Sequence, residues 1–270
     1  MTRLISNVLI AAMALTAIAL SGCGAFRLGF DPASSGIAER DADTVYISVA
    51  ASTQGAIREI VDEFEQHTGI KVHINAGSSS GLASQIQFGA PADIFLSANE
   101  KWATTVEQDG LALQRCRLLT NRLVLIVPKG NPGGVKTPQD LLAEGVQKIA
   151  LAGETVPAGI YAEQALKTLS LYENLSEQKK IVRGQDVRIA LSYVEQREAE
   201  AGLVYQTDAS ISSRVETVAT LEQESHDKII YSLVFLKHGK HNPAARELYE
   251  YLSSDARADL FLAHGFQVWK

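Results

Sequence analysis

The chain of 270 residues has little sulfur and no excess of positive charge. Both of its methionines, Met1 and Met13, lie near the start, so the chain downstream of them cannot offer the thioether ligands of a copper site. The formal net charge is -6 at pH 7. A nucleic-acid partner is not expected, because such a partner requires a basic stripe. An anionic ligand would be repelled by the overall field and would have to be bound by local dipoles.

The first residues have the features of a secretory signal. Arg3 precedes an apolar stretch over 8–20, which is too short to span a bilayer. The stretch ends in Leu20-Ser21-Gly22-Cys23, which resembles the lipobox of bacterial lipoproteins. We therefore expect a signal peptide over 1–22, with Cys23 acylated and holding the protein at a membrane. An ordinary signal peptide followed by a chance cysteine is the alternative.

Residues 23–43 show no sustained hydrophobic period and are predicted to form a solvated tether. A coil of this length reaches about 25 Å root-mean-square. The remaining residues, 44–270, are numerous and apolar enough for one large or two small domains. Cys116 has no disulfide partner once Cys23 is acylated, and it is interpreted as a small apolar residue near the start of a strand.

From residue 44 onward, strand-like and helix-like segments alternate, which predicts an α/β fold of parallel sheets with helices on both faces. The expected strands are 45–50, 72–76, 92–96, 123–128, 149–152, 202–205 and 229–236. The simplest arrangement has two lobes, with the chain crossing between them near 121 and near 228. Lobe 1 is then 44–120 plus 229–270, and lobe 2 is 121–228. The crevice at the carboxyl ends of the strands is the expected place for a ligand.

The run Gly77-Ser78-Ser79-Ser80-Gly81 follows a strand and begins a helix, and it permits two interpretations. As G-x-S-x-G it would be the nucleophile elbow of an esterase, with Ser79 as the nucleophile. Alternatively, its hydroxyls and free backbone N–H groups at the positive end of a helix would bind an anion.

Three other strand-to-helix junctions offer similar donors. Ser52 and Thr53 follow the first strand, Val156-Pro157-Ala158-Gly159 begins a helix with unfilled N–H groups, and Asp186 is a predicted cap that precedes Val187. Each junction alone is best explained as ordinary helix capping. If the two lobes face one another, however, the four helix starts converge.

Seven stretches of this sequence match, in order, the periplasmic molybdate-binding proteins of ABC importers, and the chain resembles that family over about 44–270. They are Ala50-Ala51-Ser52, Ser78-Ser79-Ser80, Gly89-Ala90-Pro91-Ala92-Asp93-Ile94-Phe95, Ser97-Ala98-Asn99-Glu100-Lys101-Trp102, Val156-Pro157-Ala158-Gly159-Ile160-Tyr161-Ala162, Asp186-Val187-Arg188 and Gly202-Leu203-Val204-Tyr205. The resemblance implies the two-lobe periplasmic binding protein fold of type II, with mostly parallel sheets and a ligand cleft between the lobes.

The resemblance also implies the ligand, its site and its partners. Ser52 and Ser79 would bind oxyanion oxygens through hydroxyl and backbone N–H, Ala158 and Val187 through backbone N–H, and Tyr205 through its phenol. Molybdenum would enter only as the bound molybdate, or as tungstate in its place, without direct protein ligands and without any other cofactor. The protein would be a non-enzymatic, monomeric, extracytoplasmic receptor that delivers its ligand to an ABC permease and its ATPase. Another tetrahedral oxyanion such as sulfate satisfies the same donors and is the main alternative.

Weaker interpretations remain at this point. The esterase interpretation would add Asp208 as the acid and His226, His238 or His264 as the base, in the chain order of that fold. His238 and His241 have the spacing of a metal pair, but a solvated loop is the favoured interpretation. Arg188 is expected to form a surface or inter-lobe ion pair rather than to neutralise the ligand. Glu100 and Lys101 are candidates for docking the permease, with ordinary solvation favoured.

Overall fold

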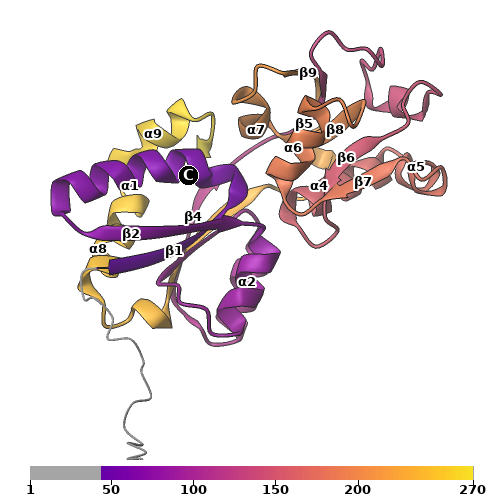
Figure 1. The fold of residues 1–270 in the computed structure, drawn as a ribbon. Coiled ribbons are helices and arrows are strands. Elements are labelled where there is room, and N and C mark those ends of the chain that lie inside the picture. Colours follow the sequence, from indigo (N-terminus) through magenta and orange to yellow (C-terminus); the bar gives the residue numbers. More distant parts are fainter. Residues whose placement is uncertain (1–43, 270) are drawn as a thin grey trace, which may run out of the picture. The chain divides into compact units, whose positions relative to one another are not determined.

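The computed structural model describes residues 44–269, and within that range strands and helices form two sheets with their covering helices (Figure 1). The predicted signal peptide, the lipidation site Cys23 and the tether over 23–43 lie outside the described residues. Among residues 44–269, no helix combines the length and the apolar character needed to cross a membrane.

The first lobe is built on a six-stranded sheet in the order β11-β4-β10-β3-β1-β2. Its strands are β1 (Thr44–Ala50), β2 (Lys71–Gly77), β3 (Ile94–Ser97), β4 (Ala112–Thr120), β10 (Ile230–Leu236) and β11 (Gln267–Val268). Its helices are α1 (Gln54–Thr68), α2 (Ser79–Gln87), α3 (Glu100–Gln108), α8 (Pro243–Ser253) and α9 (Ala258–Ala263). Short 3-10 turns occur at Ala51–Thr53, Lys237–Gly239 and Asp255–Arg257.

The second lobe is built on a five-stranded sheet in the order β7-β6-β8-β5-β9. Its strands are β5 (Leu123–Pro128), β6 (Ile149–Ala152), β7 (Ile181–Gly184), β8 (Ala201–Tyr205) and β9 (Val215–Thr220). Its helices are α4 (Pro157–Thr168), α5 (Tyr172–Glu177), α6 (Val187–Glu195) and α7 (Gln206–Ser210), with 3-10 turns at Pro138–Leu142 and Gln223–Ser225.

Both sheets are mixed, so the expectation of mostly parallel sheets is wrong, although the α/β class is as expected. Strand β1 runs parallel to β2 and β3, and β6 runs parallel to β7 and β8. Strands β10 and β5 run antiparallel to their neighbours. These strands lie next to the two passages of the chain between the sheets, from β4 to β5 and from β9 to β10. A strand that enters a sheet from the other lobe arrives from the opposite end, which explains its antiparallel pairing.

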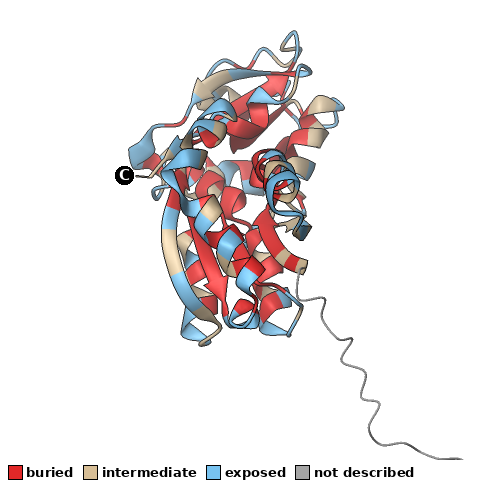
Figure 2. Cartoon of the chain, turned by 90° about the vertical axis from the view of Figure 1, so that its left-hand side faces the viewer, coloured by how far each residue is buried: buried red, intermediate tan, exposed pale blue. Residues whose placement is uncertain are grey.

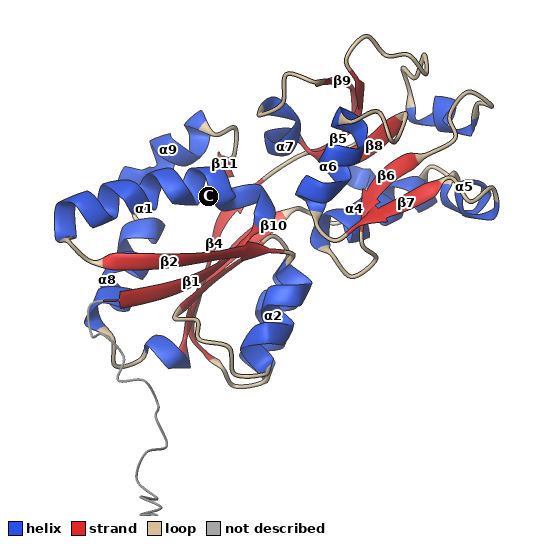
Figure 3. Cartoon of the chain, in the orientation of Figure 1, coloured by secondary structure: helices blue, strands red, loops and turns tan. Residues whose placement is uncertain are grey.

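Helices cover both faces of the first sheet, with α1 and α2 on opposite sides (Figure 3). The sequence explains this arrangement, because α1 buries one stripe of apolar residues that includes Ile57, Ile60 and Phe64. Along β3, Ile94 belongs to the core cluster beneath α1, whereas its neighbour Phe95 belongs to the cluster beneath α2. The buried residues accordingly follow the strands, and the outer helix faces are exposed (Figure 2).

Candidate functional site

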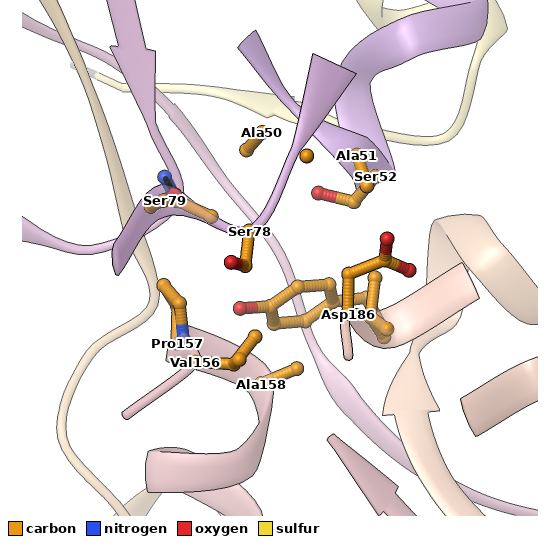
Figure 4. A pocket seen from close by; sticks show the side chains of 13 residues that line it. Ala50, Ala51, Ser52, Ser78, Ser79, Val156, Pro157, Ala158 and Asp186 are labelled. Carbon is orange, nitrogen blue, oxygen red and sulfur yellow. Dashed lines mark hydrogen bonds between the residues drawn. The ribbon is translucent and has the colours of Figure 1, made fainter. Parts of the chain in front are cut away.

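The four donor-bearing junctions meet around one small cavity of about 10 Å³ (Figure 4). The residues that line it are Ala50, Ala51, Ser52, Gly77, Ser78, Ser79, Ala98, Val156, Pro157, Ala158, Asp186, Val187 and Tyr205. All five positions that the resemblance implied are among them, and each is at most 4 % exposed. A cavity of this size is close to the minimum that holds a single water molecule. The five side chains and helix starts are therefore brought together in an enclosed space.

Ser52 lies in the 3-10 turn Ala51–Thr53, between β1 and α1. Its side chain does not cap that turn. Instead its hydroxyl oxygen lies 3.0 Å from the phenol oxygen of Tyr231 in β10. Thr53 occupies the N-cap position of α1, as expected, but its side chain does not cap the helix, because its hydroxyl donates back to the Ala50 carbonyl at 2.7 Å.

Ser79 is the first residue of α2, and the preceding Ser78 caps the helix by accepting from the Gly81 N–H at 3.2 Å. Helix capping thus falls to Ser78 and leaves Ser79 for another role. The Ser79 hydroxyl oxygen accepts a hydrogen bond from the Ala98 N–H at 2.9 Å. An oxygen that accepts in this way keeps its own proton available, so Ser79 can donate into the cavity.

Val187 and Ala158 bring backbone donors from the second lobe. Val187 begins α6, and the Asp186 carboxylate accepts from the N–H groups of Arg188 at 2.8 Å and Ile189 at 3.0 Å. The cap thus satisfies the second and third N–H groups of the helix and leaves the Val187 N–H for the cavity. Ala158 follows Pro157 at the start of α4, where the cap residue provides no side-chain hydrogen bond.

The start of α4 packs against the end of β6 with no room for a side chain at Gly159. A Cβ atom on Gly159 would lie 2.1 Å from the Gly153 carbonyl oxygen and 2.5 Å from the Ala152 carbonyl oxygen. This close approach fixes the distance between the first turn of α4 and the end of β6, and it thereby fixes the position of the Ala158 N–H.

Tyr205, at the end of β8, is 1 % exposed, and its hydroxyl has no hydrogen-bond partner among residues 44–269. Burial raises the pKa of this phenol well above its ordinary value of 10, with the neighbouring Tyr231 and Tyr161 adding to the effect. The hydroxyl therefore stays protonated. A buried hydroxyl without a partner is unusual in a folded protein, and here it lines the cavity, where a ligand oxygen would satisfy it.

Among residues 44–269, those that line this cavity include no cationic side chain, and Asp186 is the one charged residue among them. The nearby Arg188 is paired elsewhere, with its Nε 2.7 Å from the buried Asp208 carboxylate. It also donates across the lobes to the Ser52 carbonyl oxygen at 3.3 Å. Burial raises the pKa of the Asp208 carboxyl to about 7, although Arg188 opposes the shift. Any anion in the cavity would be held by neutral donors and helix dipoles.

Further hydrogen bonds join the two lobes beside the cavity. The Trp102 indole Nε1 donates to the Thr155 carbonyl oxygen at 3.0 Å, and the Asn99 amide donates to the Tyr161 phenol at 2.9 Å. Trp102 and Asn99 come from the first lobe, and Thr155 and Tyr161 from the second. The described structure therefore has its lobes in direct contact around an enclosed site.

Two polar residues near the site were not identified from sequence, Asn121 and Tyr231. Asn121 lies in the passage from β4 to β5 and donates to the Tyr231 phenol at 3.2 Å. Tyr231 is fully buried in an apolar strand, so its sequence context suggests only packing. The available signal was the position of Asn121 at the predicted crossing near 121.

The structure places the residues of the esterase interpretation apart from Ser79. The Asp208 carboxylate pairs with Arg188, and His264 Nε2 lies 2.7 Å from Glu59. His226 and His238 have other partners as well, the backbone of Asp227 and the side chain of Asp93. None of these groups lines the cavity beside Ser79, so the acid and base of the esterase interpretation are not found at the predicted nucleophile.

The structure also shows the surroundings of the other weaker candidates, which are the metal pair, the docking residues and the free cysteine. No cluster of three or more His, Cys, Asp or Glu side chains that could hold a metal ion occurs within 44–269. Glu100 pairs with Arg115 at 3.0 Å and with Arg117 at 2.7 Å. The docking role of Glu100 and Lys101 remains a prediction. Cys116 lies within β4 as a half-buried free thiol.

Two sheets joined by two chain passages, with an enclosed donor-lined cavity at their junction, define a two-lobe binding protein. The model of the bacterial extracellular solute-binding protein family matches residues 45–267, and the chain belongs to that family. YvgL of Bacillus subtilis (strain 168), by its name a substrate-binding lipoprotein of an ABC transporter, is 42 % identical over 227 residues, which cover 83 % of this chain and 86 % of YvgL.

The molybdate-binding protein ModA of Escherichia coli (strain K12) is 36 % identical over 248 residues, which cover 89 % of this chain and 95 % of ModA. Among solved structures, the periplasmic molybdate-binding protein of Azotobacter vinelandii is similar with a TM-score of 0.74 at 24 % identity. That match covers 84 % of this chain and 100 % of the other, and it confirms the expected α/β fold class.

Proposed function

We propose that this protein captures molybdate outside the cytoplasm and delivers it to an ABC import permease with its ATPase. Tungstate is expected to bind in the same way. The observation that carries the proposal is the set of five residues with available donors, Ser52, Ser79, Ala158, Val187 and Tyr205, around one cavity whose wall, within the described residues, has no cationic side chain. The similarity to ModA supports molybdate as the oxyanion.

Neutral donors can hold a dianion at such a site, provided that the lobes move apart by enough to admit its four oxygens, because the cavity of about 10 Å³ is close to the size of one water molecule. Moving a dianion out of water costs tens of kcal/mol in idealised estimates. Hydrogen bonds to a charged group contribute about 1.5 to 3 kcal/mol each, and each helix N-terminus adds up to about 2 kcal/mol in a partly buried setting. Several such donors reach a net binding free energy of about -8 to -12 kcal/mol, which corresponds to micromolar to nanomolar affinity.

The arrangement also selects among ligands. A wall in which donors predominate favours a fully deprotonated tetrahedral oxyanion, because a ligand that keeps a proton needs an acceptor, and the Asp186 carboxylate in the wall already accepts from Arg188 and Ile189. Hydrogen phosphate is disfavoured on this ground. Sulfate passes the same test and remains the alternative ligand.

Several further features belong to the same proposal. The lobes are 44–120 with 229–270, and 121–228, and the receptor acts as a monomer without enzymatic activity. A lipid on Cys23, after removal of 1–22, anchors the protein to a membrane. The name of the similar protein YvgL, a lipoprotein, supports the anchor.

A panel of oxyanions tests the function directly. A ligand at a concentration of 100 times its Kd stabilises the folded state by about 2.7 kcal/mol, which raises the melting temperature of a domain of this size by about 5 to 10 °C. Molybdate and tungstate are expected to give such shifts, whereas phosphate, sulfate and chromate give smaller ones. A shift with sulfate alone would favour the alternative ligand, and no shift with any of the five would contradict the proposal.

Replacing Tyr205 with phenylalanine is expected to weaken molybdate binding by about 1 to 2 kcal/mol, a factor of about 5 to 30. The unliganded protein is not expected to lose stability, because the removed hydroxyl has no partner to lose within 44–269. Titration calorimetry and thermal unfolding measure the two effects. Tyr249→Phe, at an equally buried tyrosine in α8 outside the cavity wall, is the matched control. Unchanged affinity in Tyr205→Phe would remove the phenol from the site.

A further inference from the structure

A chain of buried hydrogen bonds ends at the Ser52 hydroxyl. The Asn121 amide nitrogen lies 2.8 Å from the Thr207 hydroxyl oxygen and 3.2 Å from the Tyr231 phenol oxygen. The phenol oxygen lies in turn 3.0 Å from the Ser52 hydroxyl oxygen. Asn121 is 9 % exposed and Tyr231 is fully buried. Of the four residues in this series of hydrogen bonds, Ser52 alone lines the cavity.

The direction of each hydrogen bond in this chain follows from one backbone group. The Arg122 N–H can only donate, and it lies 2.9 Å from the oxygen of the Asn121 amide. The amide nitrogen must therefore face the other way, where it donates one proton to Thr207 and the other to Tyr231.

The Tyr231 phenol keeps its own proton, because burial raises its pKa far above the ordinary value of 10. Its oxygen already accepts from Asn121. Among residues 44–269, Ser52 provides the acceptor for the phenol proton. Ser52 thus accepts from Tyr231, and the proton of Ser52 is left for the cavity.

We propose that Asn121 and Tyr231 are positioning residues that orient this chain, so that Ser52 presents its proton, and not only lone pairs, to the bound oxyanion. The inference rests on the proposed function. If the chain ran in reverse, Ser52 would donate to Tyr231 and only its lone pairs would face the ligand's oxygens, which would repel them. The hydrogen bond that Ser52 accepts from Tyr231 also makes Ser52 a stronger donor, because a hydroxyl that accepts a hydrogen bond donates more strongly.

The substitution Asn121→Asp tests this direction, since it keeps the shape of the side chain but replaces the donor with an acceptor. Tyr231 is then expected to donate to the new carboxyl group and to accept from Ser52, which reverses the chain. Titration calorimetry with molybdate is expected to show that the affinity falls by a factor of about 10 or more. The added negative charge also repels the ligand, so a second background is needed to separate the two effects.

The background Tyr231→Phe provides that separation, because it retains the charge at position 121 but cuts the chain. We expect Asn121→Asp to weaken binding markedly in the wild-type protein and severalfold less in Tyr231→Phe. An equal loss of affinity in both backgrounds would show that charge alone acts, and it would overturn the proposal. Tyr249→Phe serves as the control background, where the full effect of Asn121→Asp is expected.

A second cycle covers the case in which Asn121→Asp does not fold, as judged by its thermal unfolding. Tyr231→Phe is expected to weaken molybdate binding when Ser52 is present and to have little further effect in Ser52→Ala. Additive losses would mean that Tyr231 does not act through Ser52. If the wild-type protein binds sulfate and not molybdate, the proposed function fails, and the same cycles with sulfate still test the hydrogen-bond chain.

Discussion

Replacing Gly159 with alanine is expected to weaken molybdate binding by about 10- to 150-fold and to destabilise the protein. The added Cβ would lie 2.1 Å from the Gly153 carbonyl oxygen, and neither backbone can yield without moving the start of α4 away from β6. Overpacking of this kind costs about 1 to 3 kcal/mol of folding free energy, and more where backbone is involved. The shift also displaces the Ala158 N–H, whose charge-assisted hydrogen bond is worth about 1.5 to 3 kcal/mol.

Titration calorimetry and thermal unfolding measure the two effects of Gly159→Ala. The matched control is Gly145→Ala, because a Cβ at Gly145 meets no atom within 4 Å. The control is expected to bind and unfold like the wild-type protein. Normal affinity in Gly159→Ala would show that the position of this helix start does not matter for binding.

Replacing Val187 with proline is expected to weaken molybdate binding by about 10- to 150-fold while the protein stays folded. Proline lacks the N–H that faces the cavity, and the loss of one hydrogen bond to a charged ligand costs about 1.5 to 3 kcal/mol. The first position of a helix tolerates proline well. The preceding Asp186 has an extended backbone, with φ -146° and ψ -177°, which a following proline accepts.

The control for Val187→Pro is Val187→Ala, which truncates the side chain but keeps the N–H. Calorimetry is expected to give near-normal affinity for Val187→Ala and a large loss for Val187→Pro. Equal affinities for the two variants would exclude the Val187 N–H as a ligand group. Thermal unfolding without ligand shows whether α6 still forms.

The sequence predicted those parts of the fold that have a strong local pattern. Strand β5, Leu123–Pro128, is buried along its whole length and appears as a continuous apolar run. Strand β7, Ile181–Gly184, was not predicted, because it is mostly half-buried and contains Arg183, whereas the equally short β6 is a fully buried apolar run. Strand β9, Val215–Thr220, is half exposed and is defined mainly by its pairing with β5. Pairing between distant segments is not encoded in a local pattern, which also explains why the mixed character of the sheets was not foreseen.

In the candidate site, too, the features with a local sequence pattern were predicted and those that depend on long-range contacts were not. Capping chemistry and strand ends indicated the four helix starts, and the resemblance supplied the five ligand positions. Tyr231 and Asn121 are 110 residues apart in the sequence, and only the folded chain brings their side chains within 3.2 Å. An isolated tyrosine in an apolar strand is indistinguishable from ordinary packing. The hydrogen bond between the Ser52 hydroxyl and the Tyr231 phenol is likewise a long-range contact, which no local sequence pattern indicates.

Within the part of the chain that the structure describes, the cavity wall has no cationic side chain, and this bears on the salt conditions under which the ligand is captured. Exposed charges lose most of their mutual attraction beyond about 8 Å at physiological ionic strength, because dissolved ions screen them. Dipoles that are enclosed between the lobes, behind contacts such as that of Trp102 with Thr155, lie out of reach of those ions. A receptor outside the cytoplasm is exposed to the ionic strength of the cell's surroundings. A binding site built from buried dipoles keeps its affinity for the ligand when that ionic strength changes.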